Sequence, residues 1–130
     1  MSIILIPASD SPVCRDLTTG LTGADCTVIR AGPDHLTTAA LRSLGADLIV
    51  FELTHPRLNV MATIHRIHQD PQLRMRQAVL GECRNCLQAA RDLGADLAIN
   101  HPCNPANTLM VIRVLLSLTG LHRVSCQTGS

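Results

Sequence analysis

The side chains with the most versatile chemistry stand at the ends of apolar runs. Glu52 and Glu82, the only two glutamates of the chain, each follow such a run, and His101 and Cys103 follow a third. Ligands of open α/β sheets bind outside the carboxyl ends of the strands. If these runs are strands of one sheet, carboxylate, imidazole and thiol groups gather at one edge, where they could bind a metal ion or undergo thiol chemistry.

Cys83 and Cys86 have C-x-x-C spacing, which allows two thiolates to bind one metal ion or to form a disulfide. Arg84 lies between them and could lower the pKa of a thiol. With His101 and Cys103 the pair could complete a four-ligand zinc site, although residues on adjacent loops are often close without binding a metal. A metal-binding or thiol-redox sensor is therefore one hypothesis for this chain.

We expect Cys83 and Cys86 to be the most reactive thiols in the structured part of the chain. They follow a strand end at the start of a helix, where unpaired backbone amides and the helix dipole favour the thiolate. Cys14 and Cys26 lie on apolar faces and are expected to be small core residues. Cys126 lies in the polar C-terminal segment.

The composition excludes several kinds of function. All 11 basic residues are arginine, so no mechanism can use a lysine of this chain. Phe51 is the only aromatic residue, and the formal net charge of +1 includes no basic block, so we expect no nucleic-acid partner. Motifs for nucleotide binding and serine hydrolysis are missing from the sequence, and we expect no cofactor.

The first residues predict neither a signal peptide nor a membrane span. The apolar run at residues 1–6 has no basic region before it and ends at Pro7. Six cysteines without an export signal are typical of reduced thiols. We therefore expect a cytoplasmic protein that has no membrane partner.

Apolar runs alternate with segments of helical periodicity. The predicted strands are residues 2–6, 25–31, 47–52, 78–80 and 96–99. The predicted helices begin at Ser11-Pro12, at Gly32-Pro33-Asp34, near Leu58, at Asn85 and at Asn104-Pro105. Such alternation requires parallel strands joined by right-handed crossovers. The predicted fold class is α/β, a flavodoxin-like, doubly wound five-stranded parallel sheet of order 2-1-3-4-5 with helices on both faces.

One domain is expected over residues 1–121, followed by a loose tail at residues 122–130. Within the domain, Leu-Gly-Ala-Asp-Leu occurs at residues 44–48 and again at residues 93–97, each time between a helix and a strand. Glycine commonly follows the last helical residue. We interpret the repeat as shared loop geometry and not as evidence of a duplication.

Two segments resemble the receiver domain of bacterial response regulators. In residues 47–56, Asp-Leu-Ile-Val-Phe-Glu-Leu-Thr-His-Pro, an apolar strand ends in Glu52, where receivers carry the phospho-accepting aspartate. In residues 94–102, Gly-Ala-Asp-Leu-Ala-Ile-Asn-His-Pro, His101 stands where receivers have a lysine. The resemblance covers about residues 2–119 and implies the CheY-like form of the fold.

The departures from the receiver pattern imply that phosphoryl chemistry is lost. Receivers hold magnesium with acidic residues after the first strand, but this stretch is Pro7-Ala8-Ser9, with Asp10 as the nearest acid. Their hydroxyl residue after the fourth strand would fall near Gly81-Glu82. Phosphoryl transfer depends on a metal ion and a cation that neutralise the developing charge. We therefore expect a non-catalytic pseudo-receiver, not an enzyme, that is not competent for standard aspartate phosphorylation.

The expected degenerate phosphoacceptor pocket contains Glu52, His101, Asp10 and Glu82. Glu52 either imitates a phosphorylated aspartate, by placing negative charge further from the backbone, or is a partly solvated carboxylate without a signalling role.

The pseudo-receiver resemblance implies a signalling role through protein–protein interaction, with a protein partner or a homodimer contacting the fourth helix, fifth strand and fifth helix. The last helix carries more apolar residues than can face the sheet at a period of 3.6 residues. We expect its interaction surface to consist of Met110, Val111, Arg113 and Val114.

Overall fold

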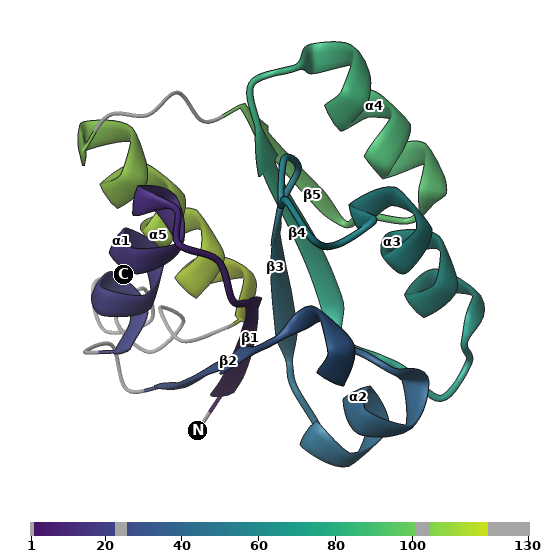
Figure 1. Cartoon of the computed structure of the whole chain (residues 1–130). Coiled ribbons are helices and arrows are strands. Elements are labelled where there is room, and N and C mark those ends of the chain that lie inside the picture. Colours follow the sequence, from purple (N-terminus) through teal and green to yellow (C-terminus); the bar gives the residue numbers. More distant parts are fainter. Residues whose placement is uncertain (1, 23–25, 101–104, 120–130) are drawn as a thin grey trace, which may run out of the picture.

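The computed structural model describes residues 2–22, 26–100 and 105–119. Within them, five parallel strands form one sheet of order β2-β1-β3-β4-β5, with helices between and after the strands (Figure 1). The predicted fold class is confirmed. The strands are β1 (Ser2–Pro7), β2 (Cys26–Ala31), β3 (Leu48–Glu52), β4 (Arg76–Gly81) and β5 (Leu97–Asn100). The helices are α1 (Pro12–Thr22), α2 (Thr38–Leu44), α3 (Val60–Gln69), α4 (Arg84–Leu93) and α5 (Pro105–Thr119), with a short 3-10 helix at Pro33–His35.

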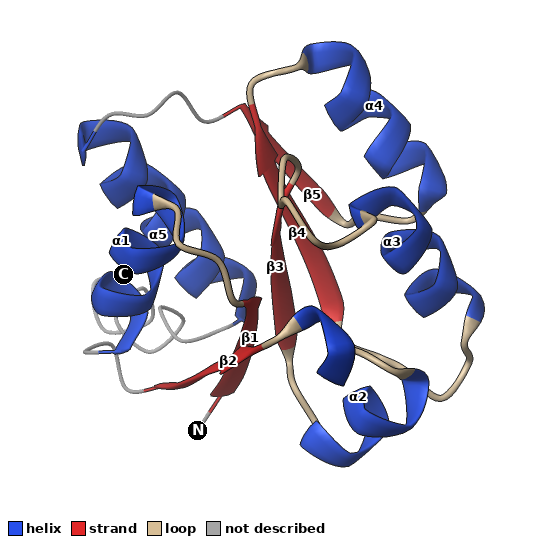
Figure 2. Ribbon diagram, viewed as in Figure 1, coloured by secondary structure: helices blue, strands red, loops and turns tan. Residues whose placement is uncertain are grey.

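The helices form two layers, one on each face of the sheet (Figure 2). α1 and α5 cover one face, and α2, α3 and α4 cover the other. Side chains of each strand alternate between the layers, so Ile4 and Ile6 pack with α1 and α5, whereas Leu5 packs with the other three helices. Burial on both faces explains why the central strands are apolar at nearly every position.

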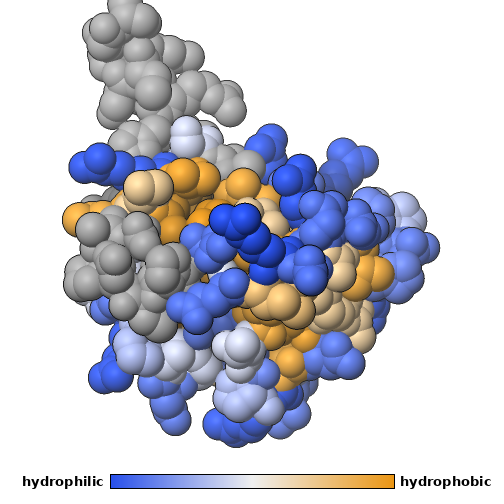
Figure 3. Space-filling view, turned by 90° about the horizontal axis from the view of Figure 1, so that it is seen from above, coloured by the Kyte–Doolittle hydropathy of each residue, from blue (hydrophilic) through white to orange (hydrophobic). Residues whose placement is uncertain are grey.

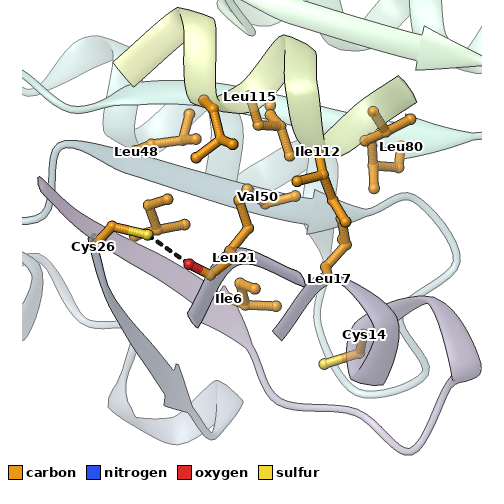
Figure 4. Packing of buried hydrophobic residues seen from close by; sticks show 14 residues of the cluster. Ile6, Cys14, Leu17, Leu21, Cys26, Leu48, Val50, Leu80, Ile112 and Leu115 are labelled. Atoms are coloured by element: carbon orange, nitrogen blue, oxygen red, sulfur yellow. Dashed lines mark hydrogen bonds between the residues drawn. The ribbon is translucent and has the colours of Figure 1, made fainter. Parts of the chain in front are cut away.

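The core between the sheet and the pair α1 and α5 is shown in Figure 4. Cys14 and Cys26 belong to this core and are buried, which confirms their predicted placement. The Cys26 thiol donates a hydrogen bond to the Leu21 carbonyl at 2.9 Å. Gly20 allows the two helices to approach closely, because a Cβ atom at this position would overlap the Ile112 side chain.

The second helix begins later than the sequence predicted. Gly32-Pro33-Asp34 was expected to open it, but Pro33–His35 forms only the 3-10 helix. Leu36 follows with a non-helical backbone (φ −99°, ψ 39°) and is buried. Thr37 is the N-cap of α2, where its hydroxyl accepts a hydrogen bond from the Ala40 N–H at 3.2 Å. Burial of Leu36 and this side-chain cap together place the start of the helix at Thr38.

β4 is longer than the predicted strand at residues 78–80. Its pairing with β3 begins at Leu48 opposite Arg76, although Arg76 and Gln77 are polar. The Gln77 side chain is nevertheless buried, and its Nε2 donates a hydrogen bond to the Ile64 carbonyl of α3 at 3.2 Å. The hydropathy pattern did not predict the first part of this strand, because Gln77 is polar although it is buried in the core.

The two Leu-Gly-Ala-Asp-Leu segments have the same role in the fold. Asp47 donates its N–H to the Ile3 carbonyl at 2.8 Å, and its carboxylate accepts the Ile3 N–H at 2.8 Å. Asp96 makes the same two contacts with Gln77, at 2.9 and 2.8 Å. Each aspartate thus joins the strand that follows it to a neighbouring parallel strand. The aspartate contacts agree with the interpretation as shared loop geometry, whereas the backbone angles of the two glycines differ.

The glycines of these two segments differ in their surroundings. Gly45 has a φ of +61° and Gly94 a φ of +126°, a backbone region that favours glycine. A Cβ atom at Gly45 would meet nothing within 4 Å, whereas one at Gly94 would overlap the ring and Cβ of His68. The loop before β5 is therefore packed against α3, and the loop before β3 is open.

α5 divides its apolar residues between the core and the surface. Leu109, Met110 and Val114 are exposed by 59%, 62% and 39%, and Arg113 is exposed as well. Val111 is only 3% exposed and packs in the core under α1. Its placement on the interaction surface was therefore wrong, because Val111 lies on the same buried side of the helix as Thr108, Ile112 and Leu115. None of the helices in the described part of the chain is long and apolar enough to cross a membrane.

Candidate functional site

Glu52 is held in place by two serine hydroxyls. It ends β3 at the carboxyl edge of the sheet, opposite the loop between β1 and α1. The Ser9 hydroxyl donates to Glu52 Oε1 at 2.8 Å, and the Ser11 hydroxyl donates to Oε2 at 2.6 Å. Both carboxylate oxygens therefore accept a hydroxyl hydrogen bond, and the bond from Ser11 is the shorter of the two.

The two serines are themselves fixed by further hydrogen bonds, from a backbone N–H to Ser11 and from an arginine side chain to Ser9. The Ser11 oxygen accepts the Cys14 N–H at 3.0 Å, which caps the first turn of α1. The Ser9 carbonyl accepts a hydrogen bond from Arg30 of β2 at 3.0 Å. The sequence placed Ser11 at the start of a helix but did not show the contact of either serine with Glu52, because more than forty residues separate the partners.

His55 holds the neighbouring loops in place through both of its ring nitrogens. The ring is buried, with Nε2 2.7 Å from the Ala8 carbonyl and Nδ1 3.1 Å from the Arg57 N–H. Because a backbone N–H can only donate, Nδ1 must be the acceptor and Nε2 must carry the proton. Both ring nitrogens are thus engaged with the backbone, so His55 positions the loops after β1 and β3 and is not free to bind a ligand.

Predicted pocket residues meet in two adjoining hollows. A cavity of about 320 Å³ with mainly apolar walls is lined by Glu52, Glu82 and Cys83, among others. A smaller one of about 180 Å³ is lined by Glu52 and Asp10, together with the loop of His55. Figure 3 looks down on this edge of the sheet, where hydrophobic surface lies among hydrophilic side chains. His101, the fourth predicted member, lies outside the described residues.

A side chain at Gly81, one of the two residues near which the receiver hydroxyl is expected, would overlap Leu53. A Cβ atom here would lie 2.8 Å from Cδ2 and 2.9 Å from Cβ of Leu53. The Leu53 N–H also donates to the Leu80 carbonyl at 2.8 Å, which ties the two strand ends together. The apolar side chain of Leu53 thus stands against the position of the expected hydroxyl.

Cys83 and Cys86 lie together at the start of α4. Cys83 is the N-cap, and its sulfur accepts the Cys86 N–H at 3.2 Å. Hydrogen bonds from the Cys86 thiol and then from the Cys86 N–H lower the pKa of the Cys83 thiol below its usual value, whereas the bond to Cys83 raises the pKa of Cys86. The cause is the neighbouring thiol and the helix N-terminus, rather than Arg84 as the sequence suggested. Cys83 is exposed, in contrast to the buried Cys14.

The described residues do not form the four-ligand zinc site that the sequence suggested. In residues 2–22, 26–100 and 105–119, no three His, Cys, Asp or Glu side chains are grouped so that they could hold a metal ion. Two of the four ligands proposed for zinc, His101 and Cys103, lie outside these ranges. Cys83 and Cys86 remain as a pair of thiols.

The fold is that of response-regulator receiver domains. A putative response regulator from Chloroflexus aurantiacus superposes with a TM-score of 0.75 at 18% identity, over 92% of this chain and 98% of the other. The phosphorylated cyanobacterial phytochrome response regulator RcpA gives a TM-score of 0.75 at 19% identity, over 88% and 91%. The chemotaxis response regulator CheY4 of Vibrio cholerae gives 0.68 at 17% identity, over 89% and 99%.

Neither a family model nor a curated protein matches the sequence. The superposed structures confirm the fold that the resemblance to receiver domains implied. The activity must be argued from the site.

Proposed function

We propose that this chain is a non-enzymatic, receiver-like signalling domain that acts by contact with a protein partner and is not phosphorylated at position 52. The observation that carries the proposal is the binding of both Glu52 oxygens by the hydroxyls of Ser9 and Ser11. In receivers this place holds an aspartate and a magnesium ion. Here it holds a glutamate carboxylate whose two oxygens already accept hydrogen bonds from serine hydroxyls of the same chain.

The arrangement is unsuited to phosphoryl transfer for electrostatic reasons. Transfer requires positive charge close to the oxygens of the moving phosphoryl group. Ser9 and Ser11 are neutral donors, and they direct their protons at Glu52, so they lower its nucleophilicity without attracting a phosphodonor. The chain also contains no lysine to neutralise the developing charge.

The same contacts favour a structural role for Glu52 over imitation of a phosphorylated aspartate. Its carboxylate connects β3 to the loop before α1. The other half of a receiver switch, a hydroxyl at the end of the fourth strand, is expected near Gly81-Glu82, where neither residue has a hydroxyl and Leu53 packs against Gly81. We infer that the pocket keeps one conformation and does not switch on phosphorylation. Signalling would then be controlled by the availability of the partner protein.

The partner, another protein or a second copy, is proposed to contact the surface formed by α4, β5 and α5. Leu109, Met110 and Val114 support this choice because they are the exposed large hydrophobic residues of the described chain. Arg113 adds a charge beside them. Exposed apolar clusters with a charged neighbour are common in protein interfaces.

The phosphorylation part of the proposal is tested by intact-mass measurement. The protein is incubated with magnesium and acetyl phosphate, beside a conventional receiver domain as a positive control. We expect the control to gain the mass of a phosphoryl group and this protein to gain none. An added phosphoryl mass that disappears in Glu52→Gln would overturn the proposal.

A further inference from the structure

Cys83 and Cys86 are placed for reaction with each other. They occupy the N-cap and the third residue of α4, and side chains three residues apart on a helix lie about 5–6 Å apart at Cβ. A disulfide needs a Cβ separation of about 3.5–4.5 Å, so a small tightening of the first turn joins the two sulfurs. Hydrogen bonding between the Cys83 sulfur and Cys86 already brings them together.

The two thiols differ in a way that assigns their order of reaction. Cys83 is exposed and Cys86 is partly covered. Hydrogen bonds from Cys86 stabilise the Cys83 thiolate and lower its pKa, while Cys86 keeps its proton more firmly. Since the thiolate is the nucleophile in thiol–disulfide exchange, Cys83 attacks first and Cys86 resolves.

The surroundings of the pair suit a small anionic disulfide. Cys83 borders the mainly apolar cavity beside Glu52, and on the outer side Arg84 and Arg91 line a hollow of about 310 Å³ between α4 and β5. Arg84 directly follows the reactive Cys83, whereas Arg91 lies in the last turn of α4, about 12 Å further along the helix. An extended peptide disulfide such as oxidised glutathione, bound along α4, can therefore pair its carboxylates with these guanidinium groups.

We propose that Cys83 and Cys86 form a reversible dithiol–disulfide switch that exchanges with small anionic disulfides. The Cys83 thiolate attacks one sulfur of the disulfide, forming a mixed disulfide and releasing one thiolate. Cys86 then loses its proton and attacks the Cys83 sulfur, which forms the intramolecular disulfide and releases the second thiol. The pair is oxidised by two electrons, the small disulfide is reduced by two, and excess reduced thiol reverses both steps.

The switch acts on the same part of the molecule that the proposed partner contacts. In the reduced form, the Cys83 sulfur accepts the N–H of Cys86, the third residue of α4. In the disulfide, that sulfur is uncharged and bonded to Cys86, so the cap weakens and the first turn of α4 must adjust. Because α4 packs against β5 on this surface, the redox state of the pair can alter partner binding. The chemistry itself does not depend on the proposed function.

The test uses the full chain with Cys103→Ser and Cys126→Ser, so that the pair can be followed without those two thiols. The protein is treated with oxidised glutathione, alkylated and digested with trypsin. Cleavage after Arg84 separates residues 77–84 from residues 85–91, so a disulfide is seen as two joined peptides that dithiothreitol releases. In Cys86→Ser we expect a stable glutathione adduct on Cys83, and in Cys83→Ser a much slower reaction of Cys86.

The switch would be overturned if no disulfide formed between the two peptides while Cys83 still reacted with iodoacetamide. Stoichiometric zinc bound to Cys83 and Cys86 in the purified protein would overturn it as well. Arg91→Ala tests the choice of disulfide, because it should slow reaction with glutathione about two- to fivefold. It should leave reaction with neutral 2-hydroxyethyl disulfide unchanged. Equal slowing with both reagents would contradict recognition of an anion.

Discussion

The Ser11 hydroxyl carries two contacts at once, since it donates to Glu52 and accepts the Cys14 N–H. We expect Ser11→Ala to lower the free energy of unfolding by about 1–2 kcal/mol, because a helix cap and a hydrogen bond to a charged group are both lost. Urea denaturation measures the change. A loss no greater than that of an exposed serine such as Ser43 would show that the contact with Glu52 contributes nothing.

A matched pair of variants separates the cap from the charge. Ser11→Asn and Ser11→Asp both retain a side-chain cap for α1, but only the second places a carboxylate against Glu52. We expect Ser11→Asp to be the less stable of the two by about 1 kcal/mol or more, and the difference to vanish in a Glu52→Gln background. A difference that persists there would assign it to some other neighbour.

At the residue scale, the sequence predicted which residues lie at the carboxyl edge of the sheet better than it predicted their contacts, and their role as a site stays a prediction. Glu52, Glu82 and Cys83 were placed correctly, because the carboxyl ends of parallel strands meet at one edge. The serine clamp was not found, because hydroxyl side chains serve many local purposes and their distant partner is not visible in the spacing. The reactivity order of the cysteines follows from a thiol–thiol contact and stays a prediction.

At the scale of elements, the two helix-to-strand loops provide an internal comparison. We expect Gly94→Ala to destabilise the fold by about 2–3 kcal/mol, because it combines an unfavourable positive φ with overlap on His68. Gly45→Ala shares the positive φ but meets open space, so about 1 kcal/mol is expected. Thermal or urea unfolding measures both, and equal losses would argue against the contact with His68.

The order of the elements was predictable, because strands buried on both faces and helices with one apolar side leave different periodicities. Their limits were less so. α2 begins at Thr38 because Leu36 is drawn into the core, and β4 begins at Arg76 because Gln77 is buried with its amide bonded to α3. In both cases a tertiary contact outweighed the local pattern.

At the scale of the molecule, α5 separates packing from recognition. Met110 and Val111 are neighbours in the chain, but one is exposed and the other is in the core. We expect Met110→Glu to change stability by no more than about 0.5 kcal/mol and to reduce binding to the partner or to a second copy. Val111→Glu buries a charge and should unfold the domain, at a cost of about 3 kcal/mol or more.

Circular dichroism follows folding in the two variants, and light scattering follows self-association. Wild type and Met110→Glu that are equally folded and equally monomeric, with the same recovery of a partner by pull-down, would count against α5 as the interaction surface. A folded Val111→Glu would show that the helix is rotated from the orientation described above.

The contacts of Asp47 and Asp96 hold the strand ends at the amino edge of the sheet, although Asp47 also lines a cavity of about 430 Å³ there. Strand ends fray when their terminal amides lack partners, but at the amino edge Asp47 and Asp96 accept the N–H groups of Ile3 and Gln77. The opposite edge carries Glu52, Cys83 and the hollows between the loops. We expect the amino edge of the sheet to keep its conformation when Cys83 and Cys86 are oxidised. The structural change should then be confined to α4 and should not extend into the strands.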